Sequence, residues 1–158
     1  MKLYLDTSAL LKRYVTEPGT EMADLIFDKA ERGELVVSIS LWNIGEALGV
    51  LDEKRRKGWL TEKEFEAALN IFAEELVKLI RLKALEVIPV LSSILVDAWS
   101  VLMTYHVYEA DAIQITTCKR NKNDVFVSSD RDLVKMSNRA GLESFHLIED
   151  AQRLRQTI

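Results

Sequence analysis

The chain has 158 residues, of which 48% are hydrophobic and 29% are charged, a composition expected of one ordered domain spanning residues 1–158. The single cysteine, Cys118, is expected to be buried and excludes both an intramolecular disulfide and a thiolate zinc site. The absence of a long apolar run or a signal-peptide pattern predicts a cytoplasmic protein without membrane contact, and the net charge of -4 argues against a surface built throughout for a polyanion.

The first half of the chain alternates between two kinds of apolar spacing. Short apolar runs predict strands over residues 2–5 and 35–39, and three- and four-residue spacing predicts helices from residue 9, over 22–30 and over 41–51. Ser40 is placed to cap the third of these helices, and Thr61 with Glu64 forms a capping box that starts a longer helix ending near Leu79. The last two helices are expected to pair antiparallel.

The second half of the chain continues the alternation. A short strand over residues 86–88 is followed by two helices, around 95–102 and 112–118, and then by a strand over 125–127, a helix over 130–138 and a strand over 144–148. Strands that alternate with helices or helix pairs are typical of parallel sheets. The predicted fold is therefore α/β, with a central parallel sheet of four to five strands and helices on both of its faces.

Two acidic residues directly follow predicted strands. Asp6 comes after residues 2–5, and Asp130 comes after residues 125–127 with two serines between. Because ligands of an open parallel sheet bind beyond the carboxyl ends of its strands, both residues are candidates for a functional site. An Asp at this position is also a common helix N-cap, and that alternative stays open for both.

Two further acidic residues lie in unusually apolar surroundings. Glu46 has small or aliphatic neighbours on either side in its helix, and Asp111 is flanked by alanines near the start of another helix. A buried carboxylate needs a cation, a hydrogen-bond donor or a cleft, although Asp111 can also be an N-terminal acid favoured by the helix dipole. If these four acids form a metal site, the remaining 21 acids balance the 21 basic residues of the chain.

The order of these motifs resembles the PIN-domain family, especially the small VapC-like toxin ribonucleases of toxin-antitoxin pairs. Four segments carry the resemblance: residues 5–10, the helix that contains Glu46, residues 110–113 and residues 127–133. The resemblance implies a single PIN-like domain in which one or two Mg²⁺ or Mn²⁺ ions are held by four catalytic carboxylates, those of Asp6, Glu46, Asp111 and Asp130. It also implies supporting roles for Ser8 and Ser128, with Asp132 either flanking Asp130 or substituting for it.

The activity implied by this resemblance is hydrolysis of RNA phosphodiester bonds, in which bound metal ions acidify a water molecule and stabilise charge on the phosphate. The implied partners are RNA, a cognate antitoxin and a second copy of the chain. Residues 54–57 and the basic residues of 119–122 are candidates for RNA contact, although such runs are more often solvated helix ends. Trp42 and Trp59 are candidates for protein contact, with core packing expected for Trp42.

Other enzyme classes fit the sequence less well. His106 and His146 are too few for a site built on histidine and are expected to be exposed or internally hydrogen-bonded. A phosphatase of the haloacid dehalogenase kind needs a second Asp two positions after the first, where this chain has Ser8. The main alternative is a non-catalytic PIN-like binding module within an RNA-processing assembly, against which the presence of all four acids argues.

Overall fold

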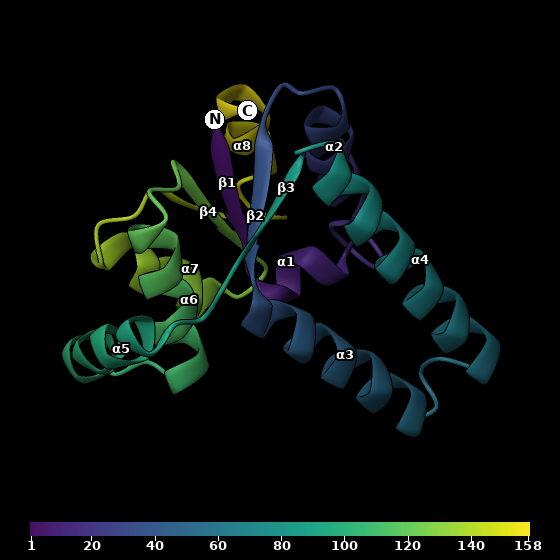
Figure 1. The fold of residues 1–158 in the computed structure, drawn as a ribbon, viewed down its shortest axis with the longest axis horizontal. Helices are drawn as coiled ribbons and strands as arrows, with labels where there is room; N and C mark the ends of the chain where they lie inside the picture. The colour runs from purple at the N-terminus through teal and green to yellow at the C-terminus, as the bar shows by residue number, and fades with distance from the viewer.

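The computed structural model describes residues 1–158 and is built around one five-stranded parallel sheet with strand order β3-β2-β1-β4-β5 (Figure 1). The strands are β1 (Lys2–Leu5), β2 (Val36–Ser40), β3 (Leu85–Ile88), β4 (Val125–Ser128) and β5 (Ser144–His146). The first strand lies at the centre of the sheet and pairs with β2 on one side and β4 on the other. The predicted α/β fold with a parallel sheet of four to five strands is confirmed.

Eight helices surround the sheet. They are α1 (Thr7–Leu11), α2 (Thr20–Glu31), α3 (Leu41–Arg56), α4 (Glu62–Arg81), α5 (Ser92–Tyr105), α6 (Glu109–Arg120), α7 (Arg131–Arg139) and α8 (Ala151–Thr157). In Figure 1 the antiparallel pair α3 and α4 forms one arm of the molecule, α5 to α7 form the other, and α1 lies between them. None of these helices combines the length and apolar character that crossing a membrane requires.

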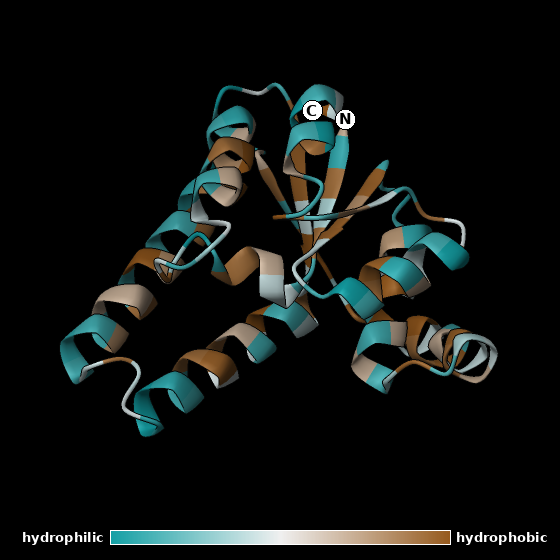
Figure 2. Ribbon diagram, turned by 180° about the vertical axis from the view of Figure 1, so that it is seen from behind, coloured by the Kyte–Doolittle hydropathy of each residue, from teal (hydrophilic) through white to brown (hydrophobic).

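The two faces of the sheet carry separate hydrophobic cores. Leu3 and Leu5 of β1 belong to the larger core, which includes residues of α2, α3 and α4. Tyr4, between them in sequence, faces the opposite side and stacks on Phe126 of β4 with ring centroids 5.6 Å apart. Cys118 is fully buried in this second core, as expected. Figure 2 shows mainly hydrophobic strands inside, with helices around them that mix hydrophilic and hydrophobic residues.

Local capping fixes where the two helices of the first arm begin. The Ser40 hydroxyl accepts a hydrogen bond from the Asn43 amide, and Thr61 with Glu64 forms the predicted capping box at the start of α4. Such caps contribute about 1 kcal/mol each to helix stability. The start of α3 therefore follows directly from the end of β2, which sets the direction in which α3 leaves the sheet.

The structure differs from the sequence prediction in three places. Helix α8 was not expected, because its seven residues are too few to show helical spacing and only Leu154 is buried. The last strand ends at His146, before the predicted residue 148. The expectation that Trp42 packs in the core is wrong, because this side chain is 41% exposed on α3.

Candidate active site

The carboxyl ends of β1 and β4 lie side by side, and each strand leads into a helix that begins at the same edge of the sheet. Leu5 pairs with Val127 in the parallel ladder, and the Asp6 amide donates to the Val127 carbonyl oxygen at 3.0 Å. Asp6 therefore follows β1 directly, while Asp130 follows β4 by two residues. The central strand pair brings together two acids that are far apart in sequence.

Asp6 is buried and strongly hydrogen-bonded. Its Oδ1 accepts from the Ala9 amide at 2.8 Å, which caps α1, and its Oδ2 accepts from the Ser128 hydroxyl at 2.8 Å. The Ser8 hydroxyl lies 2.8 and 2.9 Å from the two carboxylate oxygens. Burial raises the pKa of Asp6 to about 6 even though these hydrogen bonds lower it. Asp6 is thus both a helix cap and a member of the candidate site.

The two supporting serines also join the loops that carry the acids. The Ser129 amide donates to the Ser8 hydroxyl at 2.8 Å, and the Asp130 amide donates to the Ser128 hydroxyl at 2.9 Å. His146 lies next to this junction, with Nε2 at 2.9 Å from the Ser129 carbonyl oxygen and Nδ1 accepting two backbone amides. This histidine is internally hydrogen-bonded, as the sequence predicted, and His106 is exposed.

Glu46 is held by a buried chain of polar side chains that the sequence analysis did not identify. The Thr7 hydroxyl donates to Glu46 Oε2 at 2.5 Å, and Gln114 Nε2 lies 3.3 Å from the same oxygen. Asn43 Nδ2 contacts both Thr7 Oγ1 and Gln114 Oε1, at 2.9 and 2.7 Å, and Asn43 Oδ1 accepts from the Tyr4 hydroxyl. The one sequence signal was the presence of Asn43 and Gln114 among apolar neighbours.

Asp111 and Asp130 have fewer partners. Asp111 lies in the first turn of α6 and accepts no hydrogen bond from the protein. Its pKa is raised to about 6, first by burial and then by the negative charges of Asp130 and Glu46. Asp130 is exposed and uses Oδ1 to accept the Asp132 and Leu133 amides, so it is the N-cap of α7. Its Oδ2 has no partner within the protein.

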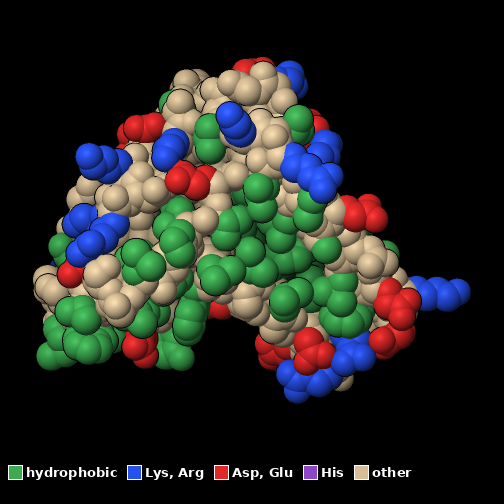
Figure 3. Space-filling model, viewed as in Figure 1, with side chains coloured by type: hydrophobic (Ala, Val, Ile, Leu, Met, Phe, Trp, Pro, Cys, Tyr) green, Lys and Arg blue, Asp and Glu red, His purple; other side chains and the backbone are tan.

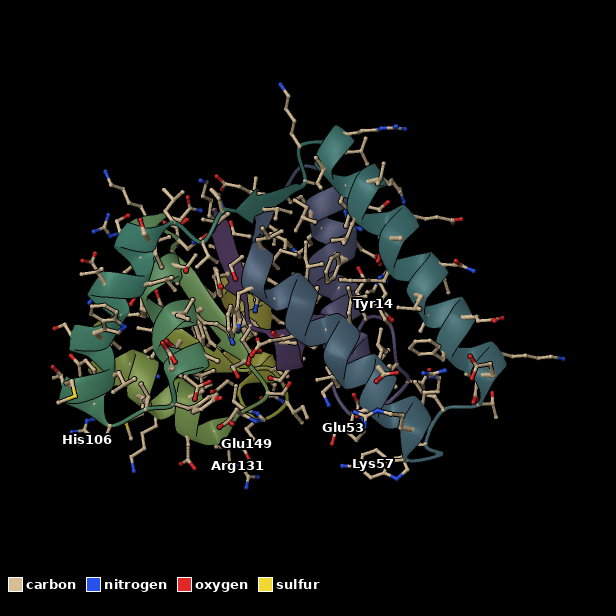
Figure 4. The ribbon with its side chains drawn as sticks, turned by 60° about the horizontal axis from the view of Figure 1, so that its bottom comes forward. Tyr14, Glu53, Lys57, His106, Arg131 and Glu149 are labelled. Carbon is tan, nitrogen blue, oxygen red and sulfur yellow. The ribbon has the colours of Figure 1, made fainter.

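All four acids line one cleft, with a volume of about 450 Å³. Ser8 lines it as well, and Ser128 lies buried beneath Asp6. Asp132 does not line this cleft but a neighbouring hollow beside Asp130. In Figure 4 the labelled Glu53 of α3, which also lines the cleft, and Arg131 at the start of α7 lie on the two sides of this face. The tertiary structure therefore brings together four segments from separate elements.

The donor chemistry of the cleft fits a hard divalent cation, because carboxylate oxygens are the ligands that such ions prefer. No three Asp, Glu, His or Cys side chains, however, lie close enough together to form a ready-made metal cluster. The carboxylates of Asp6 and Glu46 are bound to different neighbours, and the charge of Asp111 is repelled by Asp130 and Glu46. The acids thus share a cleft without converging on one point.

Comparison with known proteins identifies the family to which this fold belongs. The PIN domain family model matches residues 3–138. The fold is similar to that of PAE2754 from Pyrobaculum aerophilum, with a TM-score of 0.65 and 19% identity, covering 99% of this chain and 90% of that one. No curated protein matches the sequence.

Two further solved structures come from toxin-antitoxin systems. VapC20 of Mycobacterium tuberculosis, described as a sarcin-ricin loop cleaving toxin, has a TM-score of 0.61 and 19% identity over 89% of this chain and 95% of that one. VapBC2 of Rickettsia felis, bound to a DNA fragment from its promoter, has a TM-score of 0.65 and 12% identity over 92% and 98% of the two chains. At these identities the likeness shows the fold alone. Because the family match spans most of the sequence, the chain belongs to the PIN domain family.

Proposed function

We propose that the chain is a metal-dependent endoribonuclease that hydrolyses RNA phosphodiester bonds. The observation that carries this proposal is the presence of Asp6, Glu46, Asp111 and Asp130 in one cleft at the carboxyl edge of the sheet. Two of these carboxylates have a pKa raised to about 6, which is typical of groups arranged for chemistry or for cation binding. Membership of the PIN family supports a nuclease, and the complete set of acids argues against a purely binding role.

The four carboxylates are the proposed ligands of one or two Mg²⁺ or Mn²⁺ ions. When bound, such ions supply positive charge that stabilises the phosphate and makes a coordinated water more acidic. The residues of the chain hold the ligands in place: Ser8 and Ser128 fix both oxygens of Asp6, and Thr7 fixes Glu46. Asp111 and the unpaired oxygen of Asp130 are available to adjust to a cation.

Cleavage of RNA by the purified protein tests this assignment. With Mg²⁺ or Mn²⁺ present, the Asp6→Asn and Asp111→Asn variants are expected to cleave at least about 100-fold more slowly than the wild type, and EDTA is expected to stop cleavage. Asp28→Asn is a matched control, because Asp28 is an exposed acid of α2 outside the cleft. Equal rates for the wild type and Asp6→Asn, or no cleavage by either, would favour the non-catalytic binding module.

The proposal includes a toxin role, with a cognate antitoxin and a homodimer. Supporting it, all three tryptophans, Trp42, Trp59 and Trp99, are between 41% and 68% exposed, and tryptophan is a residue type enriched at protein interfaces. Figure 3 shows hydrophobic side chains gathered on one face, with Lys, Arg, Asp and Glu around them. Light scattering of the purified chain tests the dimer, and co-purification with the product of an adjacent small reading frame tests the antitoxin.

A further inference from the structure

The cleft that holds the four acids also contains two lysines and a glutamate that bridges them. Lys12 follows α1 and Lys54 lies near the end of α3, and both line the cleft. Lys12 Nζ is 3.4 Å from one carboxylate oxygen of Glu17, and Lys54 Nζ is 3.5 Å from the other. The two lysine side chains are only 15% and 18% exposed, so they are held inside the cleft rather than extended into solvent.

These lysines are the only basic residues among the side chains that line the cleft, where six are acidic. The other members of the basic run at the end of α3 are paired elsewhere: Arg55 and Arg56 with Asp52, and Lys57 with Glu53. In the second basic group expected to contact RNA, Lys119 donates to a backbone carbonyl and Arg120 pairs with Asp97, while Lys122 is exposed and lies outside the cleft. Lys12 and Lys54 thus differ from the other basic residues in lying inside the cleft that holds the four acids.

From this arrangement we infer that Lys12 and Lys54 form a subsite for a backbone phosphate of the RNA, and that Glu17 occupies this subsite in the free protein. The inference rests on the proposed nuclease function. Because the lysines line the same cleft as the four acids, a strand lying along the cleft with its scissile phosphate at the acids can place another of its phosphates at the lysines. Charge-assisted hydrogen bonds are usually 2.7–2.9 Å long, so contacts of 3.4 and 3.5 Å hold Glu17 loosely. The two non-bridging oxygens of a backbone phosphate share one negative charge, as the two carboxylate oxygens do, so a phosphate can replace the carboxylate between the two ammonium groups.

The loop that carries Glu17 does not depend on this carboxylate. The Glu17 amide donates to the Thr20 hydroxyl at 3.1 Å, and the Thr20 hydroxyl donates to the Glu17 carbonyl oxygen at 2.8 Å. These backbone contacts set the shape of the loop before α2. Replacing the carboxylate by an amide therefore changes the charge between the lysines and leaves the fold of the loop intact.

RNA binding measured without hydrolysis tests the subsite. A fluorescently labelled single-stranded RNA is titrated with protein at several salt concentrations, with Ca²⁺ replacing Mg²⁺ or Mn²⁺, and its integrity is checked by gel afterwards. Lys12→Met and Lys54→Met are each expected to weaken binding about tenfold and to reduce the slope of log K against log salt by about 0.7. Glu17→Gln is expected to act in the opposite direction, with binding several-fold tighter by rough estimate, because two ammonium groups become available.

A second Lys-Glu pair provides matched controls. Lys78 of α4 and Glu31 of α2 lie 2.7 Å apart and outside the cleft, so Lys78→Met and Glu31→Gln change the net charge by the same amounts. Both are expected to bind RNA like the wild type, and Lys54→Arg is expected to retain binding. Thermal melting of every variant separates lost contact from lost fold.

The subsite is overturned if Lys54→Met binds as Lys78→Met does, if Glu17→Gln binds no more tightly than the wild type, or if the wild type binds no RNA. These outcomes are separate from failure of the nuclease. Weakened binding by the lysine variants in a protein that never cleaves RNA supports the subsite and rejects the catalytic proposal. Metal-dependent cleavage with unchanged binding by the lysine variants does the reverse.

Discussion

The carboxylates of Asp6 and Glu46 are held by side chains from other elements, whereas those of Asp111 and Asp130 are not. Ser128 of β4 binds Asp6, and Thr7 and Gln114 bind Glu46. Asp111 accepts no hydrogen bond, and Asp130 receives only the amides of its own helix. The half of the cleft that contains Asp6 and Glu46, the fixed half, is thus held in place before any ligand binds. The half that contains Asp111 and Asp130, the free half, can still adjust to a ligand.

The two halves therefore affect the stability of the fold in different ways. The fixed half contains a buried polar chain from Tyr4 through Asn43 to Glu46, and such chains stabilise a fold only when every member has a partner. The free half contains charges that repel one another, which a bound cation would relieve. Three substitutions separate the two halves experimentally.

The largest effect on stability is expected at the centre of the fixed half. Asn43→Ala removes the partner of the Tyr4 hydroxyl and of the Gln114 and Thr7 side chains, and also the side chain that completes the cap of α3. Leaving these buried groups unpaired is expected to reduce the free energy of unfolding by about 3 kcal/mol, measured by urea denaturation. Asn70→Ala, at an exposed position of α4, is the control and should change it by less than about 0.5 kcal/mol.

In the free half, a substitution is expected to increase the free energy of unfolding rather than to reduce it. Because burial and neighbouring negative charges raise the pKa of Asp111 from its ordinary value of 3.8 to about 6 in the folded protein, the folded state takes up a proton first as the pH falls. Without metal, the contribution of this group to stability therefore increases from pH 7.5 down to about pH 4.

Asp111→Asn is expected to raise the free energy of unfolding of the metal-free protein by about 1 to 2 kcal/mol at pH 7.5 and to leave a smaller gain at pH 5. Thermal or urea unfolding at the two pH values in EDTA measures this difference. A variant that is less stable than the wild type at pH 7.5 would contradict the assignment of repulsion to this half.

The smallest effect is expected for Thr7, whose substitution tests whether the fixed half contributes to the rate of RNA cleavage. Thr7→Val removes the hydroxyl that lies 2.5 Å from Glu46 while keeping the side-chain volume, and cleavage is expected to slow about tenfold. Thr7→Ser keeps the hydroxyl and is expected to remain within about threefold of the wild type. If Thr7→Val lowers the rate by reducing kcat with KM unchanged, Thr7 positions Glu46; equal rates for both variants would show that Glu46 needs no such support.

Much of the fold followed from local patterns. The parallel sheet was predictable because short apolar runs alternate with helical spacing, and the start of α4 because Thr61 and Glu64 form a capping box within four residues. Helix α8 was not predictable, since seven residues with one buried side chain carry no periodic signal. The exposure of Trp42 was missed because α3 has a weak division into polar and apolar faces.

The sequence by itself determined which residues stand at strand ends and helix starts, and therefore placed Asp6 and Asp130 at the carboxyl ends of parallel strands, whereas the tertiary structure decided that these two strands are neighbours. Only the tertiary structure decided which side chains from different helices touch. The contacts of Gln114 with Glu46, and of Glu17 with Lys12 and Lys54, depend on how α1, α3 and α6 pack around that edge. Local spacing encodes the elements, whereas contacts between distant side chains arise from packing, which no single segment of sequence specifies.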